Sequence, residues 1–233
     1  MKEHRQKRLV INSNNSRFFA ILMAFSGGAS DVYCHIYFHG LVATQTGNVI
    51  LLASDLAQKN WSQTIPKVLS IFAFTFGFIA GIWIKQKKIS VFWRSYTMIP
   101  VIIASLLIPF ASNDFHLLKL CSLAFGTGVI MLTFTGVRVE NNQYTIMMTS
   151  GNYRRMLTKW YYYFTSKNKT TVLKRNAENY TIVVVSFLIG GSIISIVSVF
   201  CGPYAIWIAT ITFFLAFIIE FFQALDCNNK VAS

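Results

Sequence analysis

Asp31 and two polar turns are the residues of this sequence whose types and spacing suggest chemistry. Asp31 lies inside a hydrophobic segment rather than at its end, and the turn Thr46-Gly47-Asn48 follows it. A carboxylate within lipid costs about 2.5–3.5 kcal/mol on insertion scales, so we expect it to face protein or a watery cavity. Two interpretations remain open: an acid that carries a proton or cation, and a buried, hydrogen-bonded acid that packs the helices. His35 is one helical turn further on and is a candidate partner for Asp31.

A second polar turn, Ser150-Gly151-Asn152, lies 104 residues after the first, counted from Gly47 to Gly151. Thr or Ser favours a helix N-cap, and Gly permits unusual backbone angles, so each turn is predicted to begin a short helix. Such an N-terminus offers N–H donors and a partial positive charge, which suit an anion or a polar solute. The same geometry also fits a capped helix at the membrane interface, and so short a motif can occur twice by chance. The predicted substrate-binding residues are Asp31, His35, Thr46, Gly47, Asn48, Ser150, Gly151 and Asn152.

The composition is that of a membrane protein. Hydrophobic residues make up 54% of the 233 positions and charged residues 12%, whereas soluble domains contain about a quarter charged residues. Lipid offers no hydrogen-bond partner to the backbone, so each crossing is expected to be a helix. The predicted spans are about 18–40, 67–84, 95–111, 117–137, 180–200 and 204–224.

Basic residues predict the orientation of these spans. Of the 21 Lys and Arg residues, 18 fall in 1–17, 85–94, 138–179 and the C-terminal tail, and the others are Lys59, Lys67 and Lys119. By the positive-inside rule, both termini are cytoplasmic. The basic N-terminus resembles the start of a signal peptide, but no small-x-small cleavage site follows its apolar core, so a retained first span is expected.

Six spans divide into two halves of three with opposite orientations. We predict a basic cytoplasmic tail (1–17), a first repeat (18–111), a second repeat (112–225) with a cytoplasmic basic segment (138–179), and a second cytoplasmic tail (226–233). Inverted repeats of this kind recur in secondary transporters, whose short or broken helices meet near the midplane. Small residues allow close helix packing, and they permit homo-oligomers without requiring them. The glycines predicted to pack helices are Gly27, Gly28, Gly126 and Gly128.

The segment Tyr153–Phe164 combines Arg154, Arg155 and Lys159 with several aromatic residues. Beside membrane spans, this mixture predicts an interfacial helix that binds anionic lipids rather than nucleic acid. Residues 165–179 are interpreted as a solvated linker, and Glu220 as an acid at headgroup level. The four cysteines are far apart and no catalytic motif is present, so we expect no metal, no cofactor and no enzymatic activity.

The residues around both turns resemble the YoaK-type family of bacterial multi-spanning membrane proteins, whose molecular function is not established. The resemblance rests on GGASDVYCHIYFHGLVATQTGNVILL in the first half and on LAFGTGVIML and YTIMMTSGNYRRM in the second. It implies an all-α fold in the inner membrane. The sequence departs from the family pattern at two places: Gly128-Val129 stands where a Gln-Asn-type pair is usual, and Ser150 where Thr is usual. If the Asn of that pair serves a polar site, the second half of the site is weakened here.

These observations favour a permease or channel for a small solute, with its site between Asp31 and the two turns. The alternative is a membrane protein that does not transport, such as a scaffold or a lipid-associated regulatory protein that uses residues 153–175. The sequence names neither a substrate nor a coupling ion.

Overall fold

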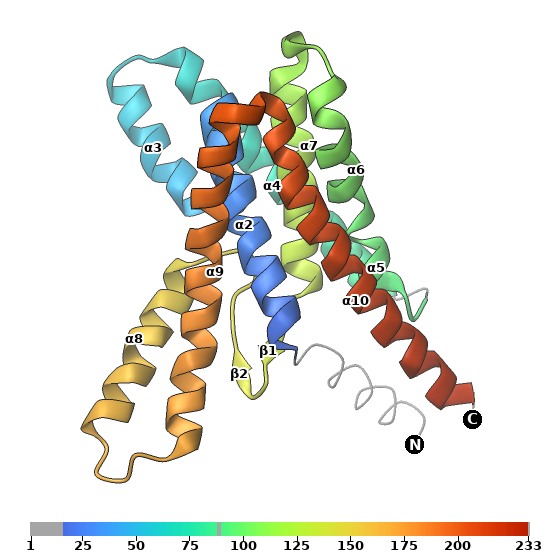
Figure 1. The fold of residues 1–233 in the computed structure, drawn as a ribbon. Helices are drawn as coiled ribbons and strands as arrows, with labels where there is room; N and C mark the ends of the chain where they lie inside the picture. Colours follow the sequence, from blue (N-terminus) through green and yellow to red (C-terminus); the bar gives the residue numbers. More distant parts are fainter. Residues whose placement is uncertain (1–15, 88–89, 233) are drawn as a thin grey trace.

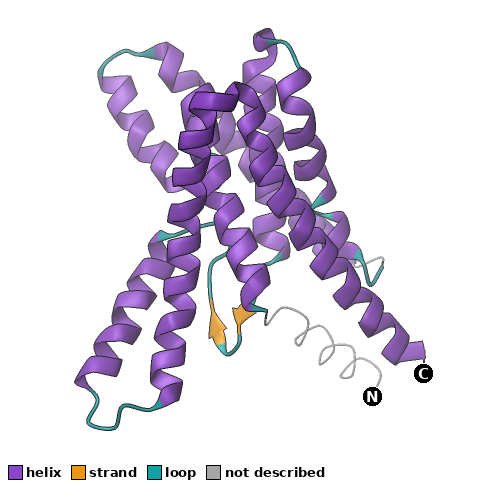
Figure 2. Cartoon of the chain, in the orientation of Figure 1, coloured by secondary structure: helices purple, strands orange, loops and turns teal. Residues whose placement is uncertain are grey.

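The computed structural model describes residues 16–87 and 90–232, so most of the predicted basic tail and Lys88 lie outside the described residues. Its elements are almost entirely helical (Figures 1 and 2), which confirms the all-α prediction. In chain order they are α2 (Arg17–Phe38), α3 (Gln45–Ala57), α4 (Trp61–Lys87), α5 (Trp93–Tyr96), α6 (Ile99–Leu107), η1 (Ile108–Phe110), η2 (Asn113–Phe115), α7 (His116–Thr133), β1 (Arg138–Val139), β2 (Asn142–Gln143), α8 (Ser150–Thr165), α9 (Thr171–Cys201), η3 (Gly202–Ile206) and α10 (Trp207–Ala232).

Within these residues, five stretches are long and apolar enough to cross a membrane. They are Arg17–Phe38, Trp61–Lys87, Trp93–Phe110, Asn113–Thr133 and Thr171–Asn229. The last stretch contains both α9 and α10, which run in opposite directions on either side of η3 (Figure 1). Large apolar side chains cover the outside of the bundle, and Val199 and Phe200 are each 80% exposed. An exterior of this kind fits lipid, so the chain is a helical membrane protein.

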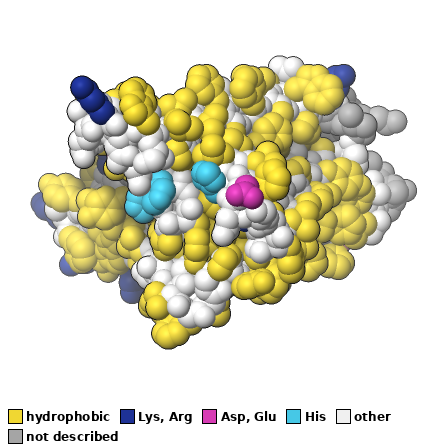
Figure 3. All heavy atoms as spheres, turned by 90° about the horizontal axis from the view of Figure 1, so that it is seen from above, with side chains coloured by type: hydrophobic (Ala, Val, Ile, Leu, Met, Phe, Trp, Pro, Cys, Tyr) yellow, Lys and Arg dark blue, Asp and Glu magenta, His cyan; other side chains and the backbone are white. Residues whose placement is uncertain are grey.

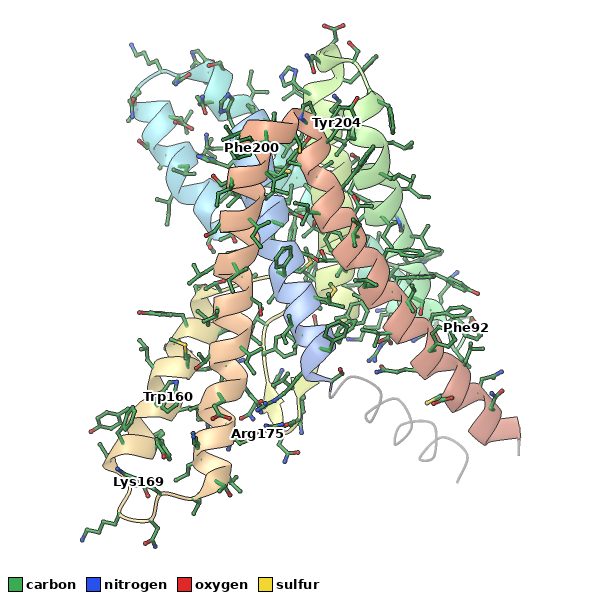
Figure 4. The ribbon with its side chains drawn as sticks, in the orientation of Figure 1. Phe92, Trp160, Lys169, Arg175, Phe200 and Tyr204 are labelled. Atoms are coloured by element: carbon green, nitrogen blue, oxygen red, sulfur yellow. The ribbon has the colours of Figure 1, made fainter. Side chains whose placement is uncertain are left out.

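The two ends of the bundle differ in charge. The start of α2, the α8–α9 connection and the end of α10 lie at the lower end in Figure 1, where Figure 4 places Lys169 and Arg175. Seen from above, the opposite end is mostly apolar and uncharged, with scattered charged groups (Figure 3). Two lysines predicted for that end have partners there: Lys67 Nζ lies 2.6 Å from the Asp55 carboxylate, and Lys119 Nζ donates to the Ala111 carbonyl at 2.7 Å.

Glycines bring helices of the two halves of the chain into backbone contact. Helix α2 packs on α9, and α7 packs on α4. At each contact an added Cβ would lie too close to a carbonyl oxygen of the facing helix, so only Gly fits without a shift. An added Cβ would meet the carbonyl oxygen of Phe187 at Gly28, of Phe25 at Gly190, of Phe125 at Gly77 and of Phe74 at Gly128. A Cβ on Gly126 would meet Val101 of α6 at 2.9 Å.

Helix α9 begins at Thr171, so the interpretation of residues 165–179 as a linker is wrong for most of its length. The Thr170 hydroxyl caps the helix by accepting from Leu173 N–H. Residue Asn179 is fully buried, and its side chain accepts from Arg17 Nε at 2.7 Å. Polar contacts of this kind stabilise a helical end that its composition alone does not predict. Helix α10 likewise continues through the predicted tail to Ala232.

The short β1–β2 hairpin was not predicted from the sequence. It pairs Arg138 with Gln143 and Val139 with Asn142. At its tip, the Glu140 carboxylate accepts from Arg175 at 2.6 Å and from Asn179 at 2.9 Å. Glu140 therefore fastens the hairpin to the lower end of α9.

Candidate functional site

Asp31 is 4% exposed, and its carboxylate holds the turn before α3. Oδ1 accepts the backbone N–H groups of Val42 at 2.8 Å and Ala43 at 2.7 Å. Oδ2 accepts the N–H of Thr44 at 3.1 Å and a short hydrogen bond from its hydroxyl. The N–H groups that this carboxyl group accepts belong to the loop before α3 and not to the helix N-terminus at Thr46-Gly47-Asn48, where the sequence predicted an anion site.

The sequence indicated the wrong partner for Asp31. His35 is exposed, whereas both Asp31 oxygens face residues 42–44, which come from beyond the end of α2. The chain reverses because His39 adopts a left-handed conformation (φ 57°) and caps α2. The helical i,i+4 spacing alone carries no information about this reversal.

Asn48 fixes the same turn from inside α3. Its side chain is fully buried and binds both backbone groups of Leu41: Oδ1 accepts the N–H at 2.8 Å, and Nδ2 donates to the carbonyl at 2.7 Å. The Ser70 hydroxyl of α4 donates to the same carbonyl. The Asn therefore ties the start of the short helix to the loop seven residues earlier.

Asn152 makes the same arrangement in the second half. It is fully buried, its Oδ1 accepts the Thr145 N–H at 2.9 Å, and its Nδ2 donates to the Thr145 carbonyl at 2.7 Å. Nδ2 also donates to the Met148 carbonyl at 2.7 Å. Here too, the Asn holds the residue seven positions before it.

Neither Thr46 nor Ser150 is the cap that the sequence suggested. The N-cap positions are Thr44 and Thr149, one residue before Gln45 and Ser150 respectively. Thr46 and Ser150 are exposed within the first helical turns. Backbone strain is not the role of the two motif glycines, since neither Gly47 nor Gly151 has a positive φ. A Cβ on Gly47 would instead meet the Leu41 side chain at 2.6 Å.

Both turns pack against α2. The first turn is bound to Asp31. In the loop before the second turn, the backbone of Met147 packs so closely on Gly27 that a Cβ added to this glycine would lie 2.6 Å from it. Gly27 and Asp31 are four residues apart, roughly 6 Å along one face of the helix. From this level α3 runs to the upper end and α8 to the lower end (Figure 1). Folding thus packs two segments that are 104 residues apart in the chain on the same helix, one helical turn from each other.

Glu220 is a second buried acid, and its burial was not predicted from the sequence. It is 3% exposed, and Arg94 Nη1 lies 3.8 Å from its Oε1. The Arg94 guanidinium also lies 6.0 Å from the Phe134 ring centroid. Glu220, the acid that the sequence placed at headgroup level, is therefore buried where α10 packs on α5, close to the end of α7. The sequence did not predict this pair, because Arg94 was assigned to the basic loop 85–94 and not to a partner of Glu220.

Helix α8 presents an apolar and aromatic surface at the lower end of the bundle. Leu157, Tyr161 and Phe164 are each more than half exposed. Trp160, labelled in Figure 4, instead faces α9, where its indole N–H donates to the Thr181 hydroxyl at 2.8 Å. Arg155 is also engaged internally, since it donates to the Gln143 carbonyl at 2.8 Å.

A comparison with protein families matches residues 19–219 to the family described as "Protein of unknown function (DUF1275)". Neither a curated protein nor a solved structure matches this chain. The match contains both polar turns and Asp31.

Proposed function

The chain belongs to the DUF1275 family, in agreement with its resemblance to YoaK-type proteins, and from its structure we propose that it is a permease or channel for a small polar solute. The observation that carries this proposal is that two turns, one bound by the buried Asn48 side chain and the other by Asn152, pack on one face of α2 beside the buried Asp31. Helical membrane proteins that transport solutes place interrupted helices of this kind near the midplane. The proposal includes no enzymatic activity, no cofactor and no nucleic-acid partner.

In this proposal the chain crosses the cytoplasmic membrane six times as two inverted repeats. Asn48 and Asn152 each bind the backbone of the residue seven positions earlier, and this shared pattern supports a repeat. The glycine contacts of α2 with α9 and of α7 with α4 also support it. The opposite courses of α3 and α8 support the inversion. The basic residues at the lower end support cytoplasmic termini. An external location for residues 85–94 or 138–179, found by reporter fusion or cysteine accessibility, would contradict it.

The substrate-binding part of the proposal concerns the surface between the two turns. Asp31 already accepts the backbone N–H groups of the first turn, so these donors are not available to an anion. A polar, uncharged solute or a cation therefore fits the first turn better than an anion does. The candidate residues remain those around Asn48, Asn152 and Asp31.

Flux into liposomes tests this function. Purified protein is reconstituted and exposed to a panel of neutral, cationic and anionic solutes, with and without a pH gradient. We expect uptake of at least one neutral or cationic solute above that of empty liposomes. Flux confined to anions would contradict the assignment made from Asp31, and no flux with any solute would favour the alternative.

The alternative function is a scaffold or lipid-associated regulatory protein, and the exposed face of α8 favours it. In this case Arg154, Arg155 and Lys159 bind anionic lipid headgroups. Replacing Arg154 and Lys159 by Gln would then weaken association with anionic lipid. The permease proposal expects the same variant to keep its solute flux, because α8 points away from α2 beyond its first turn.

A further inference from the structure

An apolar groove lies on the outside of the bundle, away from Asp31 and the two turns. It has a volume of about 320 Å³ and is formed by α4, the α5–α6 segment and α7. Its base is buried, since Val129 is 2% and Thr97 3% exposed, while Trp83 and Tyr96 are half exposed at its sides. The volume is within the range of about 300–1,000 Å³ typical of ligand sites.

The groove has an apolar inner end and a polar outer end. Ser90 and Trp93 line it from the α4–α5 connection and the start of α5, and Pro100 and Phe125 line it from within α6 and α7. From Trp93 to Pro100 the chain advances seven residues, roughly 10 Å if helical. The groove therefore runs inward from the expected membrane interface, in the direction taken by a lipid chain.

A cationic group stands at the outer end. Lys87 Nζ lies 4.5 Å from the centroid of the Trp83 ring, which lines the groove. The sequences of α4, α5, α6 and α7 contain no acidic residue, so the helices that form the groove offer Lys87 no carboxylate. The Ser90 hydroxyl oxygen accepts from Phe92 N–H, which leaves its own O–H to donate. An ammonium and a hydroxyl at the interface are suited to a phosphate.

We propose that this groove binds an anionic phospholipid, with its phosphate at Lys87 and Ser90 and one acyl chain between Trp83 and Trp93. The charge at the groove's outer end selects an anionic headgroup, and the aromatic walls accommodate the chain. This site is separate from the surface of α8 and does not depend on solute transport.

Tryptophan fluorescence tests the proposal, because Trp83 and Trp93 line the groove. A full-length variant with Trp61, Trp160 and Trp207 replaced by Phe retains these two reporters. It is reconstituted with phosphatidylglycerol or phosphatidylcholine carrying brominated acyl chains, which quench nearby tryptophans. One lysine near an anionic headgroup supports an affinity for phosphatidylglycerol about fivefold higher than for phosphatidylcholine. We therefore expect phosphatidylglycerol to reach the same quenching at about one fifth of the mole fraction that phosphatidylcholine needs.

Two charge variants and one shape variant identify the site. Lys87→Gln should abolish the preference for phosphatidylglycerol, while Lys59→Gln, an exposed lysine at the other end, should leave it unchanged. Ala80→Phe should fill the groove and reduce quenching by both lipids. Equal quenching by the two lipids in the parent protein would overturn the proposal, as would a preference that survives in Lys87→Gln. Because Lys87 is exposed, its variant decides the matter even if Ala80→Phe does not fold.

Discussion

Replacing Asp31 by Leu should destabilise the protein more than any other single change at the candidate site. Leu removes the acceptor for Val42 and Ala43 N–H, and both residues are completely buried. An unsatisfied buried donor costs about 1–3 kcal/mol, so the two together should lower the free energy of unfolding by about 2–6 kcal/mol. Thr44 adds less because it is partly exposed and can bind water.

Asp31→Asn should cost less, because the amide oxygen still accepts from Val42 and Ala43. The amide NH₂ then faces the Thr44 N–H, and the loss of one hydrogen bond to a charged group costs about 1.5–3 kcal/mol. Unfolding midpoints in detergent, followed by size-exclusion chromatography, should rank the parent above Asn and Asn above Leu. Asp114→Asn, in the exposed 3₁₀ helix η2, is the matched control and should change little.

The same variants separate the two interpretations of Asp31. If Asp31 couples transport to protons, Asp31→Asn should fold and lose pH-dependent flux. Normal pH-driven flux in the Asn variant would rule out that coupling. A Leu variant as stable as the parent protein would refute the structural reasoning, since three backbone donors would then have lost their acceptor without cost.

Three further predictions concern packing, the Asn clamps and pH. Gly28→Ala should reduce the yield of folded protein, because its Cβ would lie 2.0 Å from a backbone oxygen, whereas Gly151→Ala meets nothing nearer than 3.7 Å and should gain up to about 1 kcal/mol in thermal stability. Asn48→Ala and Asn152→Ala should lower the unfolding midpoint by similar amounts in parallel melts, and a large difference would contradict the equivalence of the two turns. Hydrogen bonds from Arg175 and Asn179 hold the pKa of Glu140 below its ordinary value of 4.5. The unfolded chain therefore binds this proton first, so the stability from Glu140 is present above about pH 4.5 and is lost as the pH falls further. Glu140→Gln should flatten this acid limb in melts recorded against pH, and an unchanged limb would assign it to other groups.

Several features could be predicted from the sequence because they depend on local composition. Apolar runs predicted helices near all the observed spans, and the polar turns predicted the short helices α3 and α8, which begin at Gln45 and Ser150. Where an end depends on side-chain partners the prediction failed, as at Thr171, because Asn179 and Glu140 meet only after folding.

The sequence by itself determined that this protein lies in a membrane: its apolar fraction requires lipid, and the chain crosses lipid as helices. It also determined the unequal distribution of charge along the chain and the recurrence of the Gly-Asn turn. Only the tertiary structure decided which groups meet. Asp31 accepts backbone N–H groups from beyond a chain reversal, and Glu220 lies beside Arg94 of another helix. The backbone of Met147 packs against Gly27. Hydrophobicity drives burial without specifying a partner, so the pairing of buried polar groups follows from how the helices face one another.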